Sequence, residues 1–246
     1  MSGVLESFRR SRFFQGVKRR GSPTAEWAWF RFRGGLHYAR AGHVLRKRTL
    51  ERYLASTDEP ALHIGAGPVS IPGWLNTDYV SGDVFLDLSR PLPFPDGTFK
   101  YVFGEHVIEH LPEAVGFALM KEIRRVLRPG GVLRFTTPEL PKLIAIYEDR
   151  NPVIKRDEYG RWLDQITAKE NRTAAQILNN FMREWGHRFI YDEEDLTRKL
   201  LDAGFEKVVR CEPGESEHER LRGLERHGPE WENAAEAMCL EATTPA

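Results

Sequence analysis

Hydrophobic residues follow two different spacings along this chain. Short apolar runs bounded by turn-forming residues predict buried strands near 61–64, 74–78, 84–87, 100–104, 131–137, 205–212 and 236–242. Apolar positions three and four residues apart predict helices over 42–56, 112–127 and 192–203. Strands that alternate with helices imply a parallel α/β sheet, and such a sheet binds its ligand at the carboxyl ends of the strands.

Capping and turn-forming residues mark the ends of the predicted helices. Pro112 precedes the helix over 112–127, and the run Pro-Gly-Gly at 129–131 ends it. Asp192 is a good N-cap for the helix over 192–203, which Gly204 ends.

Two long connections lie outside this alternation. Residues 139–190 separate the fifth strand from the next helix, and they are helical in pattern and rich in aromatic residues. Residues 213–234 separate the last two strands. Connections of this length in a compact domain are usually functional or disordered. We therefore interpret 139–190 as a helical insertion on the substrate side and 213–234 as a loop that forms a second wall of the substrate site.

The segment 62–68, which reads L-H-I-G-A-G-P, indicates a cofactor site at the end of the first strand. Gly65 and Gly67 can adopt positive φ, and their missing side chains leave room for a ligand. A dinucleotide site requires a third glycine where Ser70 stands and a helix N-terminus for the diphosphate, but prolines at 68 and 72 leave little room for a helix. A nucleoside without phosphates fits this turn better.

Further motifs follow the glycine turn in a definite order. They are Asp87-Leu88, L-P-F-P-D-G-T-F at 92–99, G-E-H-V-I-E-H-L at 104–111 and L-R-P-G-G-V-L at 127–133. Over residues 60–137 this succession resembles the class I S-adenosylmethionine-dependent methyltransferases, in particular the methyltransferase type 11 group. Segments 179–192, 214–216 and 224–227 are similar to a bacterial subgroup of predicted methyltransferases. The resemblance implies an α/β, Rossmann-like, doubly wound sheet of seven strands with the last strand antiparallel, and S-adenosylmethionine as the methyl donor.

The resemblance also implies which residues meet the cofactor. The backbone of Gly65, Ala66 and Gly67 would line its methionine part. The carboxylate of Asp78 would accept hydrogen bonds from the ribose hydroxyls, as acids at the end of the second strand do in the family. An ordinary turn residue is the alternative interpretation of Asp78.

The remaining cofactor contacts follow from the same resemblance. Asp87 and Leu88 would bracket the adenine, unless Asp87 is only a turn or helix cap. His63 stands where the family usually has an acid that meets the cofactor's ammonium group, a role that histidine can fill only when neutral. Gly104 and Glu105 follow the fourth strand, beside the expected sulfonium.

Two histidines are candidates for catalysis. Methyl transfer is an in-line displacement that depends on holding the nucleophile about 3 Å from the methyl carbon. A base that removes the proton of a hydroxyl acceptor typically adds ~10²–10⁴-fold. His106 is the first candidate by position and His187, in a Trp-Gly-His turn, is the second, because the histidine pKa lies near neutrality. The alternatives are a structural or cofactor-contacting His106 and a His187 packed against backbone carbonyls.

The segment that contains His106 also permits a different chemistry. Residues 106–110 match the H-x-x-E-H metal motif, in which His106 and His110 on one helix face would bind zinc with Glu109 as the base of a hydrolase. Pro112 follows too closely for that helix, so we expect no metal. A further alternative is a non-catalytic protein of the same fold that binds S-adenosylmethionine.

Charge divides the chain unevenly although its formal net charge is zero. Residues 1–50 hold 12 Lys and Arg against Glu6 and Glu26, a surplus of +10 that the rest balances with −10. We expect 1–56 to form a basic helical arm that caps the methyltransferase domain 57–246, with contact to an anionic surface as the alternative. We expect no nucleic-acid partner. The expected acceptor is a small molecule, and a hydroxyl of a sugar or secondary metabolite is the leading hypothesis.

Other features bear on location. No run approaches the ~18–20 apolar residues of a membrane span, and no secretory signal is visible. Cys211 and Cys239 give no disulfide framework, so we expect reduced thiols in a cytoplasmic protein.

Overall fold

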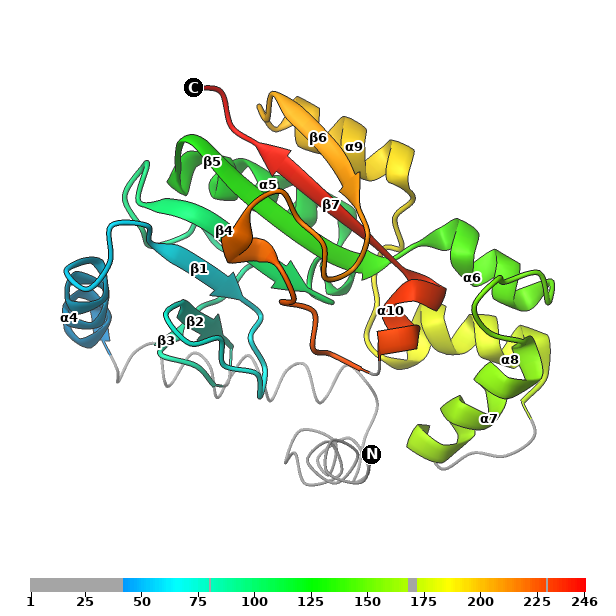
Figure 1. Ribbon diagram of the computed structural model, residues 1–246. Helices are drawn as coiled ribbons and strands as arrows, with labels where there is room; N and C mark the ends of the chain where they lie inside the picture. The colour runs from blue at the N-terminus through cyan, green and yellow to red at the C-terminus, as the bar shows by residue number, and fades with distance from the viewer. Residues whose placement is uncertain (1–41, 80, 168–171, 229) are drawn as a thin grey trace.

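The computed structural model describes residues 42–79, 81–167, 172–228 and 230–246. A seven-stranded sheet runs through them in the order β3-β2-β1-β4-β5-β7-β6 (Figure 1). The first five strands pair in parallel, whereas β7 is antiparallel to both β5 and β6. The predicted sheet with an antiparallel last strand is confirmed. The strands are β1 Ala61–Ile64, β2 Leu75–Asp78, β3 Val84–Phe85, β4 Phe99–Glu105, β5 Leu127–Pro138, β6 Lys207–Cys211 and β7 Ala237–Thr243.

The helices predicted over 42–56, 112–127 and 192–203 are also confirmed, as α4, α5 and α9. Asp192 caps α9 by accepting a hydrogen bond from Asp195 N at 2.8 Å, and Gly204 follows the helix with φ of +99°. Residues 1–41 of the predicted basic arm lie outside the described residues. The helices are α4 Gly42–Leu54, α5 Glu113–Val126, α6 Leu140–Tyr147, α7 Arg156–Thr167, α8 Ala174–Asn179, α9 Glu193–Asp202 and α10 Glu230–Glu236.

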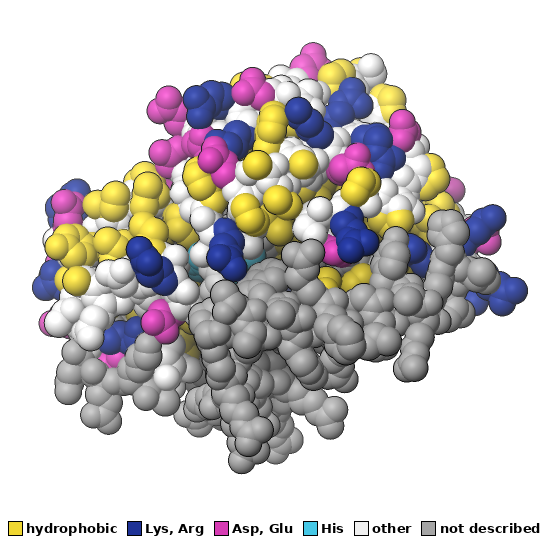
Figure 2. All heavy atoms as spheres, turned by 180° about the vertical axis from the view of Figure 1, so that it is seen from behind, with side chains coloured by type: hydrophobic (Ala, Val, Ile, Leu, Met, Phe, Trp, Pro, Cys, Tyr) yellow, Lys and Arg dark blue, Asp and Glu magenta, His cyan; other side chains and the backbone are white. Residues whose placement is uncertain are grey.

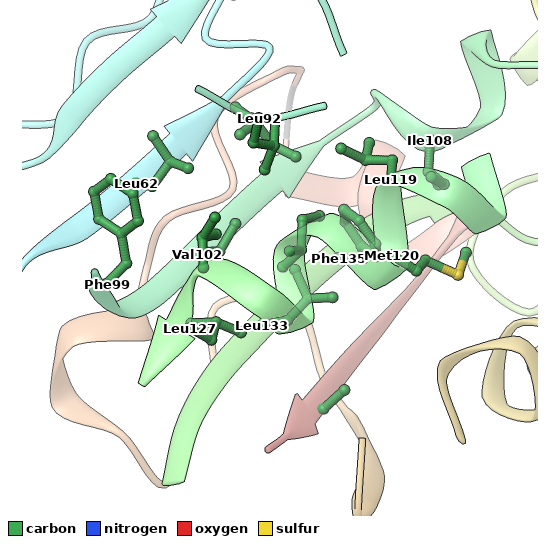
Figure 3. Close-up of a cluster of buried hydrophobic side chains, with 14 of the residues drawn as sticks. Leu62, Leu92, Phe99, Val102, Ile108, Leu119, Met120, Leu127, Leu133 and Phe135 are labelled. Atoms are coloured by element: carbon green, nitrogen blue, oxygen red, sulfur yellow. The ribbon is translucent and has the colours of Figure 1, made fainter. Parts of the chain in front are cut away.

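The larger hydrophobic core lies between the sheet and the helices α5 and α9. Alternate residues of β1, such as Leu62 and Ile64, point to this side, where they meet Met120 of α5. Figure 3 shows the centre of this core, where Val102 lies among aromatic and aliphatic side chains from β4, β5 and α5. The outer surface of the molecule on this side mixes acidic and basic side chains with scattered hydrophobic ones (Figure 2).

The opposite face of the sheet is covered in a different way. Only a turn joins β1 to β2 and, in the described part of the chain, no helix lies between them. A connection between β6 and β7, residues 212–228, crosses this face instead (Figure 1). Its Leu221 and Leu224 pack with Trp74 and Phe103 in a second core cluster. The connection 212–228 thus covers the face of the sheet that a helix between β1 and β2 would otherwise cover.

The helical insertion forms a third cluster at the carboxyl ends of the parallel strands. Helices α6, α7 and α8 gather there with α10 (Figure 1). Tyr159 of α7 is fully buried and stacks on Phe181 with ring centroids 5.6 Å apart. The predicted loop 213–234 differs from the structure in its last part, because α10 begins at Glu230 and packs into this cluster through Ala235.

A buried arginine joins the sheet to the covering connection. Arg134 of β5 has no exposed side-chain surface, and its Nε donates to Glu225 at 2.7 Å while Nη1 donates to Glu241 of β7 at 2.6 Å. The same guanidinium donates to the carbonyls of Glu215 and Glu212, at 2.8 and 3.4 Å. One cation therefore holds two neighbouring strands and both ends of the connection.

No helix among the described residues is long and apolar enough to cross a membrane.

Replacing Arg134 should be strongly destabilising. Arg134→Met leaves Glu225 and Glu241 buried without their cation, and breaking a buried ion pair from one side typically costs about 3–5 kcal/mol. Urea unfolding should show a loss of unfolding free energy in that range. Lys47→Met, which removes an exposed pair with Glu51, is the control and should leave stability almost unchanged. A loss of less than about 1 kcal/mol in Arg134→Met would show that the cluster is dispensable.

The same variant should change how stability depends on pH. Burial would raise the pKa of Glu225, but the hydrogen bond and charge of Arg134 lower it. A carboxyl with a lowered pKa in the folded state stabilises the protein above its unfolded pKa, near 4.5, and loses that contribution as the pH falls below it. Wild-type stability should therefore fall with acidification over this range more steeply than that of Arg134→Met.

Candidate active site

The ends of β1, β2 and β4 meet at one edge of the sheet, as the parallel arrangement requires. Gly65 and Gly67 follow β1 with φ of +64° and +51°, in the left-handed region that favours glycine. A Cβ at Gly65 would lie 2.3 Å from a methyl group of Val107, so the turn after β1 packs tightly against the turn after β4. A Cβ at Gly67 would meet no atom of the described residues within 4 Å. The backbone at Gly67 therefore borders open space that a ligand could fill.

Asp78, at the end of β2, is connected to this turn. Its Oδ2 accepts a hydrogen bond from the backbone N of Gly67 at 3.0 Å, and the Ser81 hydroxyl bonds to the carbonyl of Gly67. Asp78 thus positions the glycine turn, in addition to the ribose contact that the resemblance implies. The ribose contact stays a prediction.

The predicted adenine contacts lie one strand further out. Asp87 accepts hydrogen bonds from the N and the hydroxyl of Ser89, at 3.0 and 2.6 Å, and pairs with Arg90 at 3.2 Å. Leu88 is half-buried and packs against the main core. This local bonding is what the alternative interpretation of Asp87 as a turn cap describes, and its adenine contact stays a prediction.

His63 lies on the face of β1 that the connection covers. Its Nδ1 is 3.1 Å from Oδ1 of Asn76, and its ring lies 5.3 Å from that of Phe103. Burial lowers the pKa of His63, with only partial opposition from the bond to Asn76. The imidazole is therefore neutral at physiological pH, which is the state that a contact with the cofactor's ammonium group requires.

Glu105, the last residue of β4, is an organising carboxylate at this edge. It accepts hydrogen bonds from the backbone N of Arg226 at 2.9 Å and of His227 at 3.1 Å, and from Nδ2 of Asn233 at 3.3 Å. Burial raises the pKa of Glu105, although these backbone N–H groups lower it. Gly104 before it is tightly packed, because a Cβ there would lie 3.0 Å from Ile64. The end of β4 therefore anchors the connection that covers the sheet.

His106 adopts an uncommon backbone conformation, with φ of +49°. Such a conformation costs of order 1–2 kcal/mol for a residue other than glycine. Its Nδ1 is 3.1 Å from Oε1 of Glu109, and its ring stacks on His227 with centroids 4.4 Å apart. The Nε2 atom of His106 is buried without a hydrogen-bond partner. A strained residue with a free polar atom is a reasonable mark of a functional position.

The charge state of His106 follows from this pairing. Burial would lower the pKa of His106, but the hydrogen bond and charge of Glu109 outweigh burial and raise it well above the usual range. In turn, burial would raise the pKa of Glu109, but the bond to His106 lowers it. The pair is therefore an imidazolium and a carboxylate. An imidazolium has no lone pair to accept a proton, so a base role for His106 requires its contact with Glu109 to break.

His187 ends the helical insertion and approaches the same turn. Its Nδ1 is 2.6 Å from the carbonyl oxygen of Phe181, and its ring lies 4.8 Å from that of His110. Burial, with a further contribution from the charge of His110, lowers the pKa of His187 to about 4. His187 is therefore neutral at physiological pH. Its bond to a carbonyl matches the alternative of a packed turn residue, and its catalytic role stays a prediction.

The zinc motif does not adopt the helix that it needs. Only the three residues Ile108–His110 form a 3₁₀ turn, and His106 precedes it in left-handed conformation. A different trio comes together, because ligand atoms of Glu109, His110 and His187 lie within 4.8 Å of one another. Glu109 is already bonded to His106 and to the Thr137 hydroxyl, at 3.1 and 3.0 Å. The carboxylate thus has partners within the protein.

Four polar residues at this edge were not foreseen from the sequence. Glu236 of α10 accepts a 2.5 Å hydrogen bond from the Tyr159 hydroxyl, and Glu232 and Asn233 lie one turn earlier. Glu232 and Glu236 are 6% and 1% exposed. Their spacing of four residues was a usable signal, since it places both on one face of a helix. From the sequence alone, Glu232 instead falls in the predicted loop and Glu236 at the start of a predicted strand.

The order of the strands and the antiparallel last strand are those of a class I methyltransferase fold. Residues 62–135, under half of the chain, match the methyltransferase domain family. The match covers the glycine turn, the end of β4 and most of β5, and it confirms the resemblance to S-adenosylmethionine-dependent class I methyltransferases. No curated protein matches the chain.

Distant likenesses to solved structures were also found. A SAM-dependent methyltransferase from Archaeoglobus fulgidus is 16% identical with a TM-score of 0.43, over 83% of this chain and 96% of that one. Phosphoethanolamine N-methyltransferase 2 from Haemonchus contortus, in complex with S-adenosyl-L-methionine, is 12% identical with a TM-score of 0.41, over 83% and 53%. The cyclase SpnF is 18% identical with a TM-score of 0.42, over 81% and 80%.

The glycine turn fits the cofactor of this family, S-adenosylmethionine. Gly67 leaves open space where its Cβ would stand, and no phosphate-binding helix follows the turn. His63 is neutral and Asp78 lies beside the turn, so a neutral and an anionic side chain are both available for a cationic nucleoside.

A side chain at Gly67 should prevent cofactor binding. Gly67→Val fills the open space and strains a left-handed position, so calorimetry should detect no binding of S-adenosylmethionine or of its demethylated product. The thermal midpoint should stay high enough for a folded protein at 25 °C, because the new side chain meets no neighbour. Gly97→Val, at another open left-handed glycine far from this edge, is the matched control and should bind normally. Equal affinity in both variants would exclude the glycine turn as the site.

Proposed function

We propose that the protein transfers a methyl group from S-adenosylmethionine to a hydroxyl oxygen of a small acceptor, such as a sugar, a glycan or a secondary metabolite. The observation that supports it most directly is the open backbone at Gly67, at the edge where β1, β2 and β4 end. When bound, S-adenosylmethionine supplies an electrophilic methyl group. The chain supplies the position of the reactants and a buried, polar surrounding.

The cofactor contacts are proposed as the resemblance implies them. The backbone of the turn holds the methionine part, Asp78 the ribose, and Asp87 and Leu88 the adenine, while His63, Gly104 and Glu105 border the methionine end and the sulfonium. Their common position at the carboxyl edge of the sheet supports this set.

His106 and His187 are proposed as the histidines nearest the reacting atoms, with different roles. The charged His106 offers an N–H donor through its unpartnered Nε2. His187 is neutral, and it remains a candidate for accepting a proton. His106 belongs to the short turn after β4 and bonds there to Glu109. His187 contacts the same turn through the ring of His110.

A second candidate function is a non-catalytic protein that binds the same cofactor. A screen of small acceptors with methyl-labelled S-adenosylmethionine separates the two, because only the enzyme moves label into an acceptor. The screen should include hydroxyl, amine and carbon acceptors, since fold alone does not identify the acceptor.

The protein should contain no stoichiometric zinc. Glu109 already bonds to His106 and Thr137, which leaves the trio with His110 and His187 without a fully available carboxylate. Elemental analysis of purified protein should find well under one zinc per chain, and a chelator should leave methyl transfer intact. One tightly bound zinc that is lost in His187→Gln would overturn this expectation and revive a metal-dependent function.

The variant His106→Gln distinguishes between two roles of His106, that of a hydrogen-bond donor and that of a base. Glutamine keeps an N–H donor but loses the charge, and a hydrogen bond to a charged group contributes about 1.5–3 kcal/mol. We therefore expect kcat to fall by about 10- to 100-fold with unchanged cofactor affinity. A histidine base predicts a loss of up to ~10⁴-fold together with loss of the acidic limb of the kcat–pH profile. That second result would return the base role to His106.

A further inference from the structure

Two buried polar atoms beside the turn after β4 have no hydrogen-bond partner in the described part of the chain. Nε2 of His106 and Oδ1 of Asn233 are both unpaired, and the side chain of His106 is only 6% exposed. Glu232, next to Asn233 on α10, is 6% exposed. Buried polar groups are almost always bonded, because leaving one unpaired costs the free energy of its lost hydration. Two unpaired atoms beside a buried carboxyl indicate a missing ligand.

These groups belong to one cluster around Glu105. The Glu105 carboxylate accepts from Nδ2 of Asn233, and His106 follows it directly in the chain. Glu232 precedes Asn233 on α10, close enough to feel the charges of His106 and Glu105. The carboxyl of Glu232 lies against Gly228, where a Cβ would stand 1.6 Å from its Oε2. Glycine at 228 thus makes room for this carboxyl.

The polar groups of these three residues are complementary in kind. The His106 imidazolium offers a donor, while Oδ1 of Asn233 and the carboxyl oxygens of Glu232 offer acceptors. A hydroxyl group both accepts and donates, so two neighbouring hydroxyls could satisfy all three residues. An amine reacts in its neutral form, which both donates and accepts, but at neutral pH most amines are ammonium groups. An ammonium group only donates, and it would face the positive charge of His106 without accepting its hydrogen bond.

We propose that His106, Glu232 and Asn233 bind the methyl acceptor, that this acceptor is a neutral molecule with neighbouring hydroxyl groups, and that Glu232 takes the proton of the hydroxyl that is methylated. This inference rests on the proposed function and names the acceptor class and the base for it. His106 donates to one hydroxyl and Asn233 accepts from its neighbour. Glu232 becomes a catalytic residue that the sequence did not indicate.

The reaction balances with these groups and the methyl donor alone. The hydroxyl oxygen forms a bond to the methyl carbon, and the methyl–sulfur bond breaks with its electron pair left on sulfur. The hydroxyl proton passes to a carboxylate oxygen of Glu232. The cofactor loses its positive charge and the carboxylate its negative charge, so the net charge of the buried site does not change.

The environment of Glu232 suits a base. Burial, and then the negative charge of Glu236, raise the pKa of Glu232, whereas His106 lowers it. The resulting pKa of about 8 means that Glu232 is largely protonated at neutral pH. Its ionised form, which prevails above pH 8, is a stronger proton acceptor than an ordinary carboxylate. Glu236 differs from Glu232 because it already accepts a hydrogen bond from Tyr159.

The first test uses stability, and it needs no knowledge of the acceptor. Because burial disfavours the ionised form of Glu232, Glu232→Gln should raise the thermal midpoint by about 2–4 °C. Glu225→Gln is the matched control, since it removes a buried glutamate of the same connection that pairs with Arg134, and it should lower the midpoint. Glu217→Gln, at an exposed position, should leave it unchanged. A fall in Glu232→Gln like that in Glu225→Gln would overturn the proposal, because it would mean that Glu232 has a structural partner.

The second test measures transfer of labelled methyl to two matched sets of probes. One set holds methyl glycosides and cyclic polyols, and the other holds the same compounds with one hydroxyl replaced by an amine. We expect label only where two adjacent hydroxyls remain, and in Glu232→Gln a loss of kcat of ~10²–10⁴-fold with unchanged binding of the demethylated cofactor. His187→Gln should lose much less than Glu232→Gln.

Failure of this inference can be told apart from failure of the proposed function. If calorimetry detects no S-adenosylmethionine on the wild-type protein, the proposed function fails and the acceptor assignment fails with it. If the cofactor binds but label enters only amines, or neither set, the acceptor class is overturned alone. Full transfer by Glu232→Gln, or a larger loss in His187→Gln, overturns the role of Glu232 as the base.

Discussion

The buried cation of Arg134 is the constraint on which the arrangement of this protein depends. It extends from the middle of β5 to the side of the sheet where no helix follows β1, and two carboxylates and two carbonyls surround it. Taking so many charges out of water costs free energy that only good geometry offsets. The network therefore tolerates few other arrangements of these charged groups, and it fixes the connection between β6 and β7 in one place on the sheet.

That placement determines the active site. Glu105, at the end of β4, holds the backbone of Arg226 and His227, and the ring of His227 rests on His106. The connection that Arg134 anchors at both ends is thus also bonded to the end of β4, the strand that precedes the candidate catalytic histidine. One continuous polar network thus joins the sheet, the connection that covers it and the site. Within this network the contacts with Glu109 and His227 support the strained backbone conformation of His106.

Much of the fold could be predicted from the sequence, and the site only in part. The runs that became β1, β4 and α5 are strongly patterned, and the spacing of glycines after β1 was informative because positive φ is rarely available to other residues. The state of His106 could not be predicted, since it depends on the tertiary contact with Glu109 and on the charge of Glu236, more than a hundred residues away. Glu232 and Asn233 were missed for a similar reason. Their helix has only seven residues, and only tertiary packing shows that α10 reaches the end of β4.

The position of β7 has a consequence for how the chain can assemble. It follows every other strand in the sequence, yet it lies inside the sheet between β5 and β6. Until β7 is made, β6 has no neighbour and β5 presents an open edge, which is a surface prone to pairing with other chains. Glu241, one of the two carboxylates around Arg134, also belongs to β7. An emerging chain would therefore carry an unsatisfied arginine and an exposed strand edge until β7 had left the ribosome, so its dependence on chaperones should last until β7 is made.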